Sequence, residues 1–407
     1  MDPTVDQRKE RAGRASLHAL IVGVSEYPDL PRADSPSPAA EPTFGMHSLS
    51  ASAASAAAVF NWLVNNRHLP VPLGTCRLLL APSEAEKPRL GLAPEHKPLE
   101  ATRANFATSA AEWRDDASSR PGNVAFFYFA GHGVQRTHGD HVLLFPGFGK
   151  PGNATPILWE GVALDDIMVG MGPSSDRPDV ARTQFYFVDA CRDRVDPFDQ
   201  QEWNSVPPLW KIPKLNPDMR DAVLFRTTAY GSPAYSIPND KTVFAQALLD
   251  CLGGLAGVDD GGVYDNATGD PLWCVTANSL NNALNDRIPA ISDAHGLPHQ
   301  QVEPSGRMSN LVITLLDKVP SFPVTLRAIP SGADKVAKMA VCDDDGQIRG
   351  TYLQPFPCHP ITAEFPGGYY EVRAIQDSPP LLKVRRFLSK SPSIEWRIPF
   401  QLPAPPP

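Results

Sequence analysis

The chain has 407 residues, enough for two or three domains, and its 42% hydrophobic and 20% charged content is typical of a soluble globular protein. Its formal net charge of −8 and its lack of long basic runs exclude an obvious nucleic-acid partner. No run approaches the roughly 20 apolar residues that a membrane span needs, and residues 1–15 lack the apolar core of a signal peptide, so we expect a cytoplasmic protein without a membrane partner.

Cysteine spacing and acidic clusters give no sign of a cofactor. The six cysteines form no CxxC pair, which indicates reduced thiols rather than a disulfide framework or a zinc site. The cluster DDGGVYDNATGD at residues 259–270 lacks EF-hand spacing and is interpreted as a solvated turn. No metal or other cofactor is therefore expected. The cysteines are Cys76, Cys191, Cys251, Cys274, Cys342 and Cys358.

In chain order, residues 1–15 are predicted to be a disordered lead-in, and residues 16–318 to form one domain of alternating strands and helices. Helices are expected at 48–66, capped by Ser48, and at 102–118, capped by Thr102. The alternation predicts an α/β fold with a mostly parallel sheet covered by helices on both faces. Strands are expected at 16–24, 76–80, 124–129, 184–188, 222–228 and 310–316, a hairpin strand at 141–145, and further helices at 164–171, 243–252 and 275–291.

After about residue 319 no helical periodicity is convincing. Short strand-like runs split by Gly, Pro and Asp predict a small antiparallel, β-sandwich-like domain at 319–400, followed by a disordered tail at 401–407. The runs are 324–329, 336–342, 351–353, 369–374 and 393–398.

Two apolar strands end abruptly in reactive side chains. Residues 123–133, NVAFFYFAGHG, bring His132 between two glycines, and residues 183–194, TQFYFVDACRDR, bring Cys191 two positions after Asp189. Ligands of open α/β sheets bind outside the carboxyl ends of the strands, so a thiol and an imidazole are expected together at one sheet edge.

A cysteine becomes a nucleophile when a neighbouring base removes its proton. His132 is the candidate base and Cys191 the candidate nucleophile, and the backbone amides of Gly133 and Cys191 are candidate donors to a developing oxyanion. Each motif alone also fits a structural role, since a cysteine at a strand end is often a small buried hydrophobe and a histidine near glycine a turn residue. Their occurrence together favours catalysis. His138, His141, His295 and His299 are expected in loop or hairpin contexts rather than as the base.

The chain resembles the caspase-like cysteine peptidases, specifically the bacterial metacaspase-type members, in the motif FYFAGHG followed by FYFVDACRD. Cys191 lies 59 positions after His132, close to the roughly 50 of the caspase signature, although Asp-Ala-Cys-Arg replaces Gln-Ala-Cys. The resemblance extends over most of residues 16–316. It implies a caspase-like fold, a His132–Cys191 dyad that hydrolyses peptide bonds, and a role in bacterial defence or regulated cell death. The supporting segments are HALIVGVSEYPDL, FRTTAYGSPAYSIPNDKTVFAQALLDCL and QQVEPSGRMSNLVIT.

The resemblance also implies a substrate preference. In metacaspase-type enzymes the aspartate two residues before the nucleophile lines an acidic S1 pocket for Arg or Lys, and Asp189 matches it. The alternative is that Asp189 only caps backbone amides at the strand end. The family usually carries an Asp-Ala pair on its first helix, where this chain has Ser55-Ala56, so the basic preference is expected to be weaker unless Asp29 or Asp34 substitutes.

The loop at 192–220 lies where the family divides its two subunits. Proteolytic activation, by the enzyme itself or by another protease, is one hypothesis, and an ordinary mobile loop is the alternative. The C-terminal domain is expected to recruit a substrate or partner, or to hold the enzyme inactive, and an inhibitory protein is a further candidate partner. The candidate cleavage points are Arg192, Arg194, Lys211, Lys214 and Arg220.

Two other functions stay open. A catalytically silent caspase-fold scaffold would bind a partner through its C-terminal domain, and a different acyl transfer would hydrolyse an amide in a small molecule. The intact His132 and Cys191 argue against the scaffold, and the long proline-rich loops favour peptide substrates over small molecules.

Overall fold

The computed structural model groups the chain into two compact units. One contains residues 1–250 and 287–313, and the other contains residues 251–286 and 314–407. This division differs from the boundary predicted at residue 319, because residues 251–286 group with the C-terminal strands. The residues described are 2–32, 46–137, 140–149, 158–192, 206–211, 216–228, 233–307, 311–329, 337–352, 361–377, 380–390 and 395–399.

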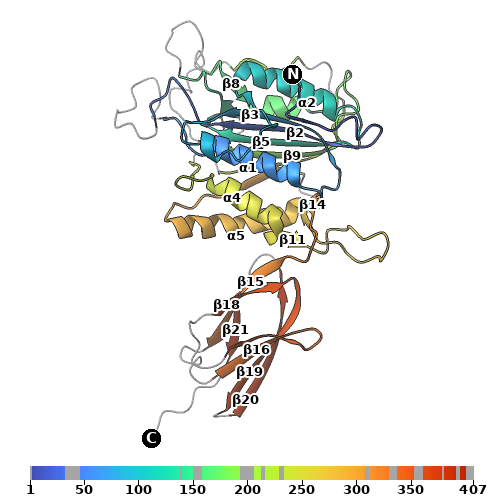
Figure 1. The fold of residues 1–407 in the computed structure, drawn as a ribbon, viewed down its shortest axis with the longest axis vertical. Helices are drawn as coiled ribbons and strands as arrows, with labels where there is room; N and C mark the ends of the chain where they lie inside the picture. The colour runs from blue at the N-terminus through green and yellow to red at the C-terminus, as the bar shows by residue number, and fades with distance from the viewer. Residues whose placement is uncertain are drawn as a thin grey trace. The chain divides into compact units, whose positions relative to one another are not determined.

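The first unit is built on one large sheet, as predicted (Figure 1). Its five central strands are parallel, and the short edge strands β1 and β13 are antiparallel to their neighbours. This confirms the mostly parallel α/β fold. Across the sheet the strands are β1 (Val5–Asp6), β3 (Leu73–Ala81), β2 (Leu17–Val24), β5 (Val124–Gly131), β9 (Thr183–Ala190), β10 (Asp221–Arg226) and β13 (Glu303–Gly306), with β4 (Leu99–Glu100) beside β3.

Helices cover both faces of this sheet (Figure 1). Helix α2 (Arg103–Ala117) lies on one face, and α1 (Ser52–Asn65) and α4 (Val243–Asp250) lie together on the other. The alanine-rich start of α1 allows a very close approach to the sheet, since a Cβ on Gly23 would lie 2.6 Å from Ala56 Cβ. Among the described residues the other α-helices are α3 (Leu164–Gly170) and α5 (Ala277–His295), and the unit boundary falls within α5.

Aromatic residues of β5 and β9 alternate between the two faces because successive strand side chains point to opposite sides. Phe127 contacts Trp113 of α2 and Tyr186, with ring centroids 5.9 and 6.0 Å apart. On the opposite face Phe126 packs against Phe187 at 5.2 Å. Both strands are consequently buried over nearly their full length, up to their carboxyl ends.

Helix caps were predicted with mixed success. Thr102 caps α2 by accepting a hydrogen bond from the Asn105 N–H at 3.2 Å, as expected. The prediction for Ser48 was wrong, because α1 begins at Ser52 and the Ser48 hydroxyl instead binds the backbone N–H and carbonyl of Tyr27.

The chain up to residue 315 also forms two smaller sheets. Strands β6 (Gly133–Thr137) and β7 (Asp140–Leu144) form the predicted hairpin, which β8 (Gly161–Ala163) extends. The strand predicted at 310–316 is β14 (Val312–Leu315), but it joins β11 (Gly257–Val258) and β12 (Cys274–Thr276) in a separate sheet. The short apolar run of β14 predicts a strand but does not specify the strand with which it pairs.

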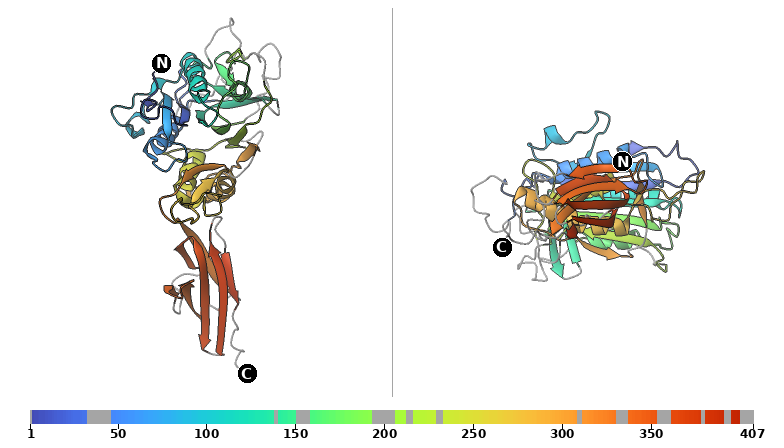
Figure 2. Two further views of the ribbon diagram at one scale, coloured as in Figure 1. Left: turned by 90° about the vertical axis from the view of Figure 1, so that its right-hand side faces the viewer. Right: turned by 90° about the horizontal axis from the view of Figure 1, so that it is seen from below.

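The C-terminal strands of the second unit form two sheets, drawn in orange to red in Figure 2. Val324 and Leu326 of one sheet and Val341 and Val372 of the other share a single apolar core, as a β-sandwich requires. The first sheet contains β18 (Ile361–Pro366), β15 (Ser321–Ile329) and β21 (Glu395–Pro399), and the second β17 (Ile348–Tyr352), β16 (Ala337–Asp343), β19 (Gly368–Asp377) and β20 (Pro380–Ser389).

A buried tyrosine joins the end of β5 to the hairpin. The Tyr27 hydroxyl accepts a hydrogen bond from the His132 N–H at 2.8 Å and donates one to the Leu144 carbonyl at 3.1 Å. The Leu144 N–H donates in turn to the His132 carbonyl at 3.0 Å. The hydroxyl therefore completes the pairing of His132 with β7.

Tyr27→Phe should lower the free energy of unfolding by about 1–3 kcal/mol, because it removes two buried hydrogen bonds and leaves their partners unsatisfied. Urea denaturation followed by tryptophan fluorescence measures this change. Tyr264→Phe, at a side chain that is 60% exposed, is the control and should leave the transition unchanged. Equal midpoints for Tyr27→Phe and wild type would contradict the structural role of the hydroxyl.

Candidate active site

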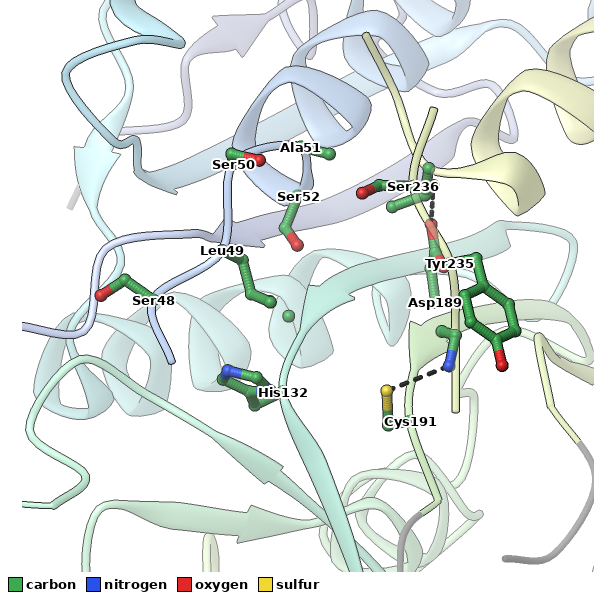
Figure 3. Close-up of a pocket in the computed structure, with 13 residues that line it drawn as sticks. Ser48, Leu49, Ser50, Ala51, Ser52, His132, Asp189, Cys191, Tyr235 and Ser236 are labelled. Carbon is green, nitrogen blue, oxygen red and sulfur yellow. Dashed lines mark hydrogen bonds between the residues drawn. The ribbon is translucent and has the colours of Figure 1, made fainter. Parts of the chain in front are cut away.

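His132 and Cys191 follow directly on two neighbouring parallel strands. The last pair in the register of β5 and β9 is Gly131 with Ala190, so the next residue of each strand lies at the same sheet edge. Both line one cleft of about 200 Å³, together with Asp189, residues 48–52 and residues 234–236 (Figure 3). The structure thus brings together the imidazole, the thiol and the carboxylate that the sequence singled out.

The protonation of His132 is set by a backbone carbonyl. Its Nε2 lies 2.7 Å from the His47 carbonyl oxygen, and because a carbonyl only accepts, Nε2 carries the proton. Nδ1 therefore holds the lone pair that a general base needs. Burial lowers the pKa of His132 to about 4, so the imidazole is neutral at neutral pH and able to accept a proton.

Gly133 is held where a larger residue would not fit. A Cβ at this position would lie 2.7 Å from the Cys191 carbonyl oxygen and would also collide with the His141 ring. Because His132 and Leu144 make the hydrogen bonds of the hairpin, Gly133 and Leu143 form a non-hydrogen-bonded pair. The Gly133 N–H consequently points away from β7, which suits a donor to an oxyanion.

The Cys191 sulfur is partly accessible and meets the backbone on the opposite wall of the cleft. It accepts a hydrogen bond from the Ala234 N–H at 3.1 Å (Figure 3). The thiols of Cys76, Cys251, Cys274 and Cys342 are buried. Among cysteines in the described ranges, Cys191 is therefore the one that a substrate could reach.

Asp189 is a buried carboxylate bound by hydroxyls. Its Oδ2 accepts hydrogen bonds from the Tyr128 hydroxyl at 3.0 Å and from the Thr242 hydroxyl. Burial raises the pKa of Asp189 to about 6, and hydrogen bonding from Thr242, Tyr128 and Thr227 opposes this rise. Within the part of the chain that the structure describes, Oδ1 has no hydrogen-bond partner. Asp189 thus lines the cleft with a carboxylate whose Oδ1 is buried.

Ser55 stands where the sequence resemblance implies a second acidic residue. The Ser55 hydroxyl accepts a hydrogen bond from the Thr242 N–H at 2.9 Å, so Ser55 reaches Asp189 through a single residue. Asp29 is exposed and does not line the cleft, and Asp34 lies outside the described residues. Asp189 is therefore the one carboxylate among the residues that line the cleft.

The candidate cleavage points differ in accessibility. Arg192 is 3% exposed, donates to Gln135 at 3.0 Å and pairs with Glu303, so its side chain is already bound. Arg220 is similarly bound, by Asp218 and by the Met168 carbonyl at 3.0 Å. Because both side chains are bound by neighbouring residues, this conformation disfavours cleavage after either arginine. The sequence identified the two arginines as basic loop residues but could not show these partners. Lys211 is exposed, whereas Arg194 and Lys214 lie outside the described residues.

Several contacts at the site could not be located from the sequence. His47, Ala234 and Thr242 come from loops far from the two strand motifs, and only the fold brings them into the cleft. The position of Thr242 could have been predicted from the sequence, because a threonine directly before a helix is a typical N-cap. Its hydroxyl accepts a hydrogen bond from the Ala245 N–H of α4 at 3.1 Å.

Across the described ranges, no group of three or more His, Cys, Asp or Glu side chains could hold a metal ion. No described helix is both long enough and apolar enough to span a bilayer.

Comparisons with known proteins found a similar solved structure and a matching family. The chain is similar to the crystal structure of caspase-1 from Spodoptera frugiperda, with 10% sequence identity and a TM-score of 0.40. The similarity covers 74% of this chain and 89% of the caspase-1 chain. No curated protein sequence matches the chain. The caspase domain of the C14 peptidases matches residues 16–260, more than half of the sequence and both strand motifs. The chain therefore belongs to the caspase-like family of cysteine peptidases.

Proposed function

We propose that the protein is a cysteine endopeptidase in which His132 and Cys191 form the catalytic dyad. The observation that carries this proposal is the hydrogen bond from His132 Nε2 to the His47 carbonyl, in a cleft shared with Cys191. It leaves a neutral imidazole with a lone pair on Nδ1, in the same cleft as a partly accessible thiol. Family membership independently supports the same chemistry.

The chemical steps follow from this arrangement. His132 Nδ1 removes the Cys191 proton, and the thiolate attacks the scissile carbonyl to give a tetrahedral oxyanion. The amides of Gly133 and Cys191 donate to that oxyanion. His132 then gives the proton to the leaving amine, and a thioester remains. Water, activated by the same imidazole, hydrolyses the thioester and regenerates the thiol.

Asp189 is the proposed basis of a preference for Arg or Lys before the scissile bond. Its unpartnered Oδ1 is buried at the cleft, and a cationic side chain would satisfy both its charge and its free lone pairs. Ser55 supplies a hydroxyl in place of the family's second acid, so the attraction comes from a single carboxylate.

Hydrolysis of fluorogenic peptides ending in Arg, Lys, Asp or Gln tests the dyad and the pocket. Cys191→Ala and His132→Ala should abolish turnover of every peptide. Asp189→Asn should lower kcat/KM for Arg and Lys peptides by roughly ten- to a hundredfold, since it removes a charge-assisted hydrogen bond. Asp29→Asn is the matched control at an exposed aspartate and should behave like wild type. Preference for Asp peptides would exclude Asp189 as the pocket residue, while leaving the dyad in place.

The pH profile should separate the two titrating groups. As pH falls through about 6, Asp189 gains a proton and loses the charge that binds a basic side chain, so kcat/KM for Arg peptides should fall. For Gln peptides the fall should begin nearer pH 4, where His132 becomes protonated. Superimposable acidic limbs for the two peptides in the wild type would contradict the assignment of Asp189.

The proposal includes activation by proteolysis in the 192–220 loop. The Ala234 N–H donates to the Cys191 sulfur, and on this proposal cleavage of the loop would let the segment around Ala234 rearrange and release the sulfur. Lys211 is the exposed basic residue in the described part of that loop. A latent peptidase of this kind would suit regulated cell death or defence, with an activating protease or an inhibitory protein as partner.

Activation predicts that trypsin-nicked protein is more active than the intact chain. A triple variant with Arg194, Lys211 and Lys214 changed to Gln should stay intact on a denaturing gel during incubation with substrate and should show at least tenfold lower activity. A fully active preparation that runs as one intact band would argue against activation by cleavage.

A catalytically silent scaffold is the alternative. An irreversible thiol-directed peptide probe distinguishes the two, since a peptidase labels at Cys191 and a scaffold does not. Labelling without peptide hydrolysis, tested also after nicking, would favour acyl transfer on a different class of amide.

A further inference from the structure

His141 is a buried histidine next to the proposed catalytic site. It lies on β7, its side chain is 2% exposed, and its Nε2 is 3.0 Å from the Cys191 carbonyl oxygen. The carbonyl accepts, so His141 carries its proton on Nε2. Burial, with the positive charges of Arg226 and Arg192, lowers the pKa of His141 to about 3, so it remains a neutral donor at neutral pH.

The contacts of His141 reach both proposed oxyanion donors. Its ring packs so closely against Gly133 that a Cβ there would collide with Nε2. Its hydrogen bond fixes the peptide plane that follows Cys191, and the pairing of Ala190 with Gly131 fixes the plane that precedes it. The backbone on both sides of the nucleophile is thereby held.

The second nitrogen of His141 supports a role beyond stability. Nδ1 is buried and has no hydrogen-bond partner among the residues that the structure describes. An unsatisfied buried acceptor destabilises a fold. Apolar side chains of similar size would avoid that cost, so the histidine is better explained by what its Nε2–H does for Cys191.

We propose that His141 is a positioning residue, which orients the Cys191 backbone and, through its packing on Gly133, the pair of amides that stabilise the oxyanion. This inference rests on the proposed peptidase function. It assigns His141 no proton transfer, since its one donor is directed at a backbone carbonyl. His132 remains the base.

Asn and Gln substitutions test which nitrogen matters. The amide nitrogen of Gln can reach the position of the imidazole Nε2, whereas that of Asn reaches only the position of Nδ1. His141→Asn and His141→Phe should lower kcat at least tenfold, equivalent to about 1.4 kcal/mol, with a smaller change in KM. His141→Gln should recover most of kcat.

Alkylation of Cys191 provides a second readout in the full-length protein. Iodoacetamide reacts with a thiolate by displacement at carbon, and no oxyanion develops. The alkylation rate of Cys191, followed by peptide mass spectrometry, should therefore stay within about twofold of wild type in all three His141 variants. His18→Asn is the matched control, because His18 is also buried and bound to one side chain, Thr75 at 2.9 Å. It should lower the melting temperature without changing the ratio of turnover to alkylation.

The outcomes are distinguishable. Wild-type kcat in His141→Asn, or a parallel loss of turnover, alkylation and melting temperature in all three variants, would overturn the positioning role and leave the peptidase proposal intact. Absence of turnover in nicked wild-type enzyme would overturn the proposed function, and this inference with it.

Discussion

The geometry of the candidate active site depends on the in-register pairing of β5 and β9. Each strand is buried on both faces by aromatic and aliphatic side chains, and the pairing extends to Gly131 and Ala190. A one-residue slip would move every side chain to the opposite face and separate the two residues that follow the strands. The core packing therefore determines where His132 and Cys191 lie.

The ionisable side chains at the site are buried in the low-dielectric core, which disfavours their charged forms. Burial of Asp189 raises its pKa from 3.8 to about 6, so the folded state binds this proton more tightly than the unfolded chain does. Ionisation above pH 6 thus costs the fold roughly 3 kcal/mol. His132 shows the opposite effect, because its lowered pKa makes the fold lose stability as pH falls from 6.5 toward 4. Such costs are typical of residues placed for function rather than stability.

The sequence predicted a helix or strand correctly where a single local feature, such as a continuous apolar run or a helix cap, specified it. The continuous apolar runs of β2, β5 and β9 and the Thr102 cap of α2 were identified because burial and capping act over a few residues. Strand β20 was missed because its basic run, KVRRFLS, does not resemble a strand core, although it pairs with β19 along its full length. Strand β13 was missed because a four-residue edge strand containing Pro304 is recognisable only by its pairing with β10.

By itself, the sequence determined the α/β class, the family and the two strand motifs that end in His132 and Cys191. These features are local, since hydrophobic period and motif spacing are readable along the chain. Tertiary structure alone decided the surroundings of the motifs: the His47 carbonyl on His132, the hydroxyls of Tyr128 and Thr242 on Asp189, and the bond from His141 to Cys191. These contacts join residues far apart in the chain, and a hydrogen bond has no sequence period from which it could be predicted.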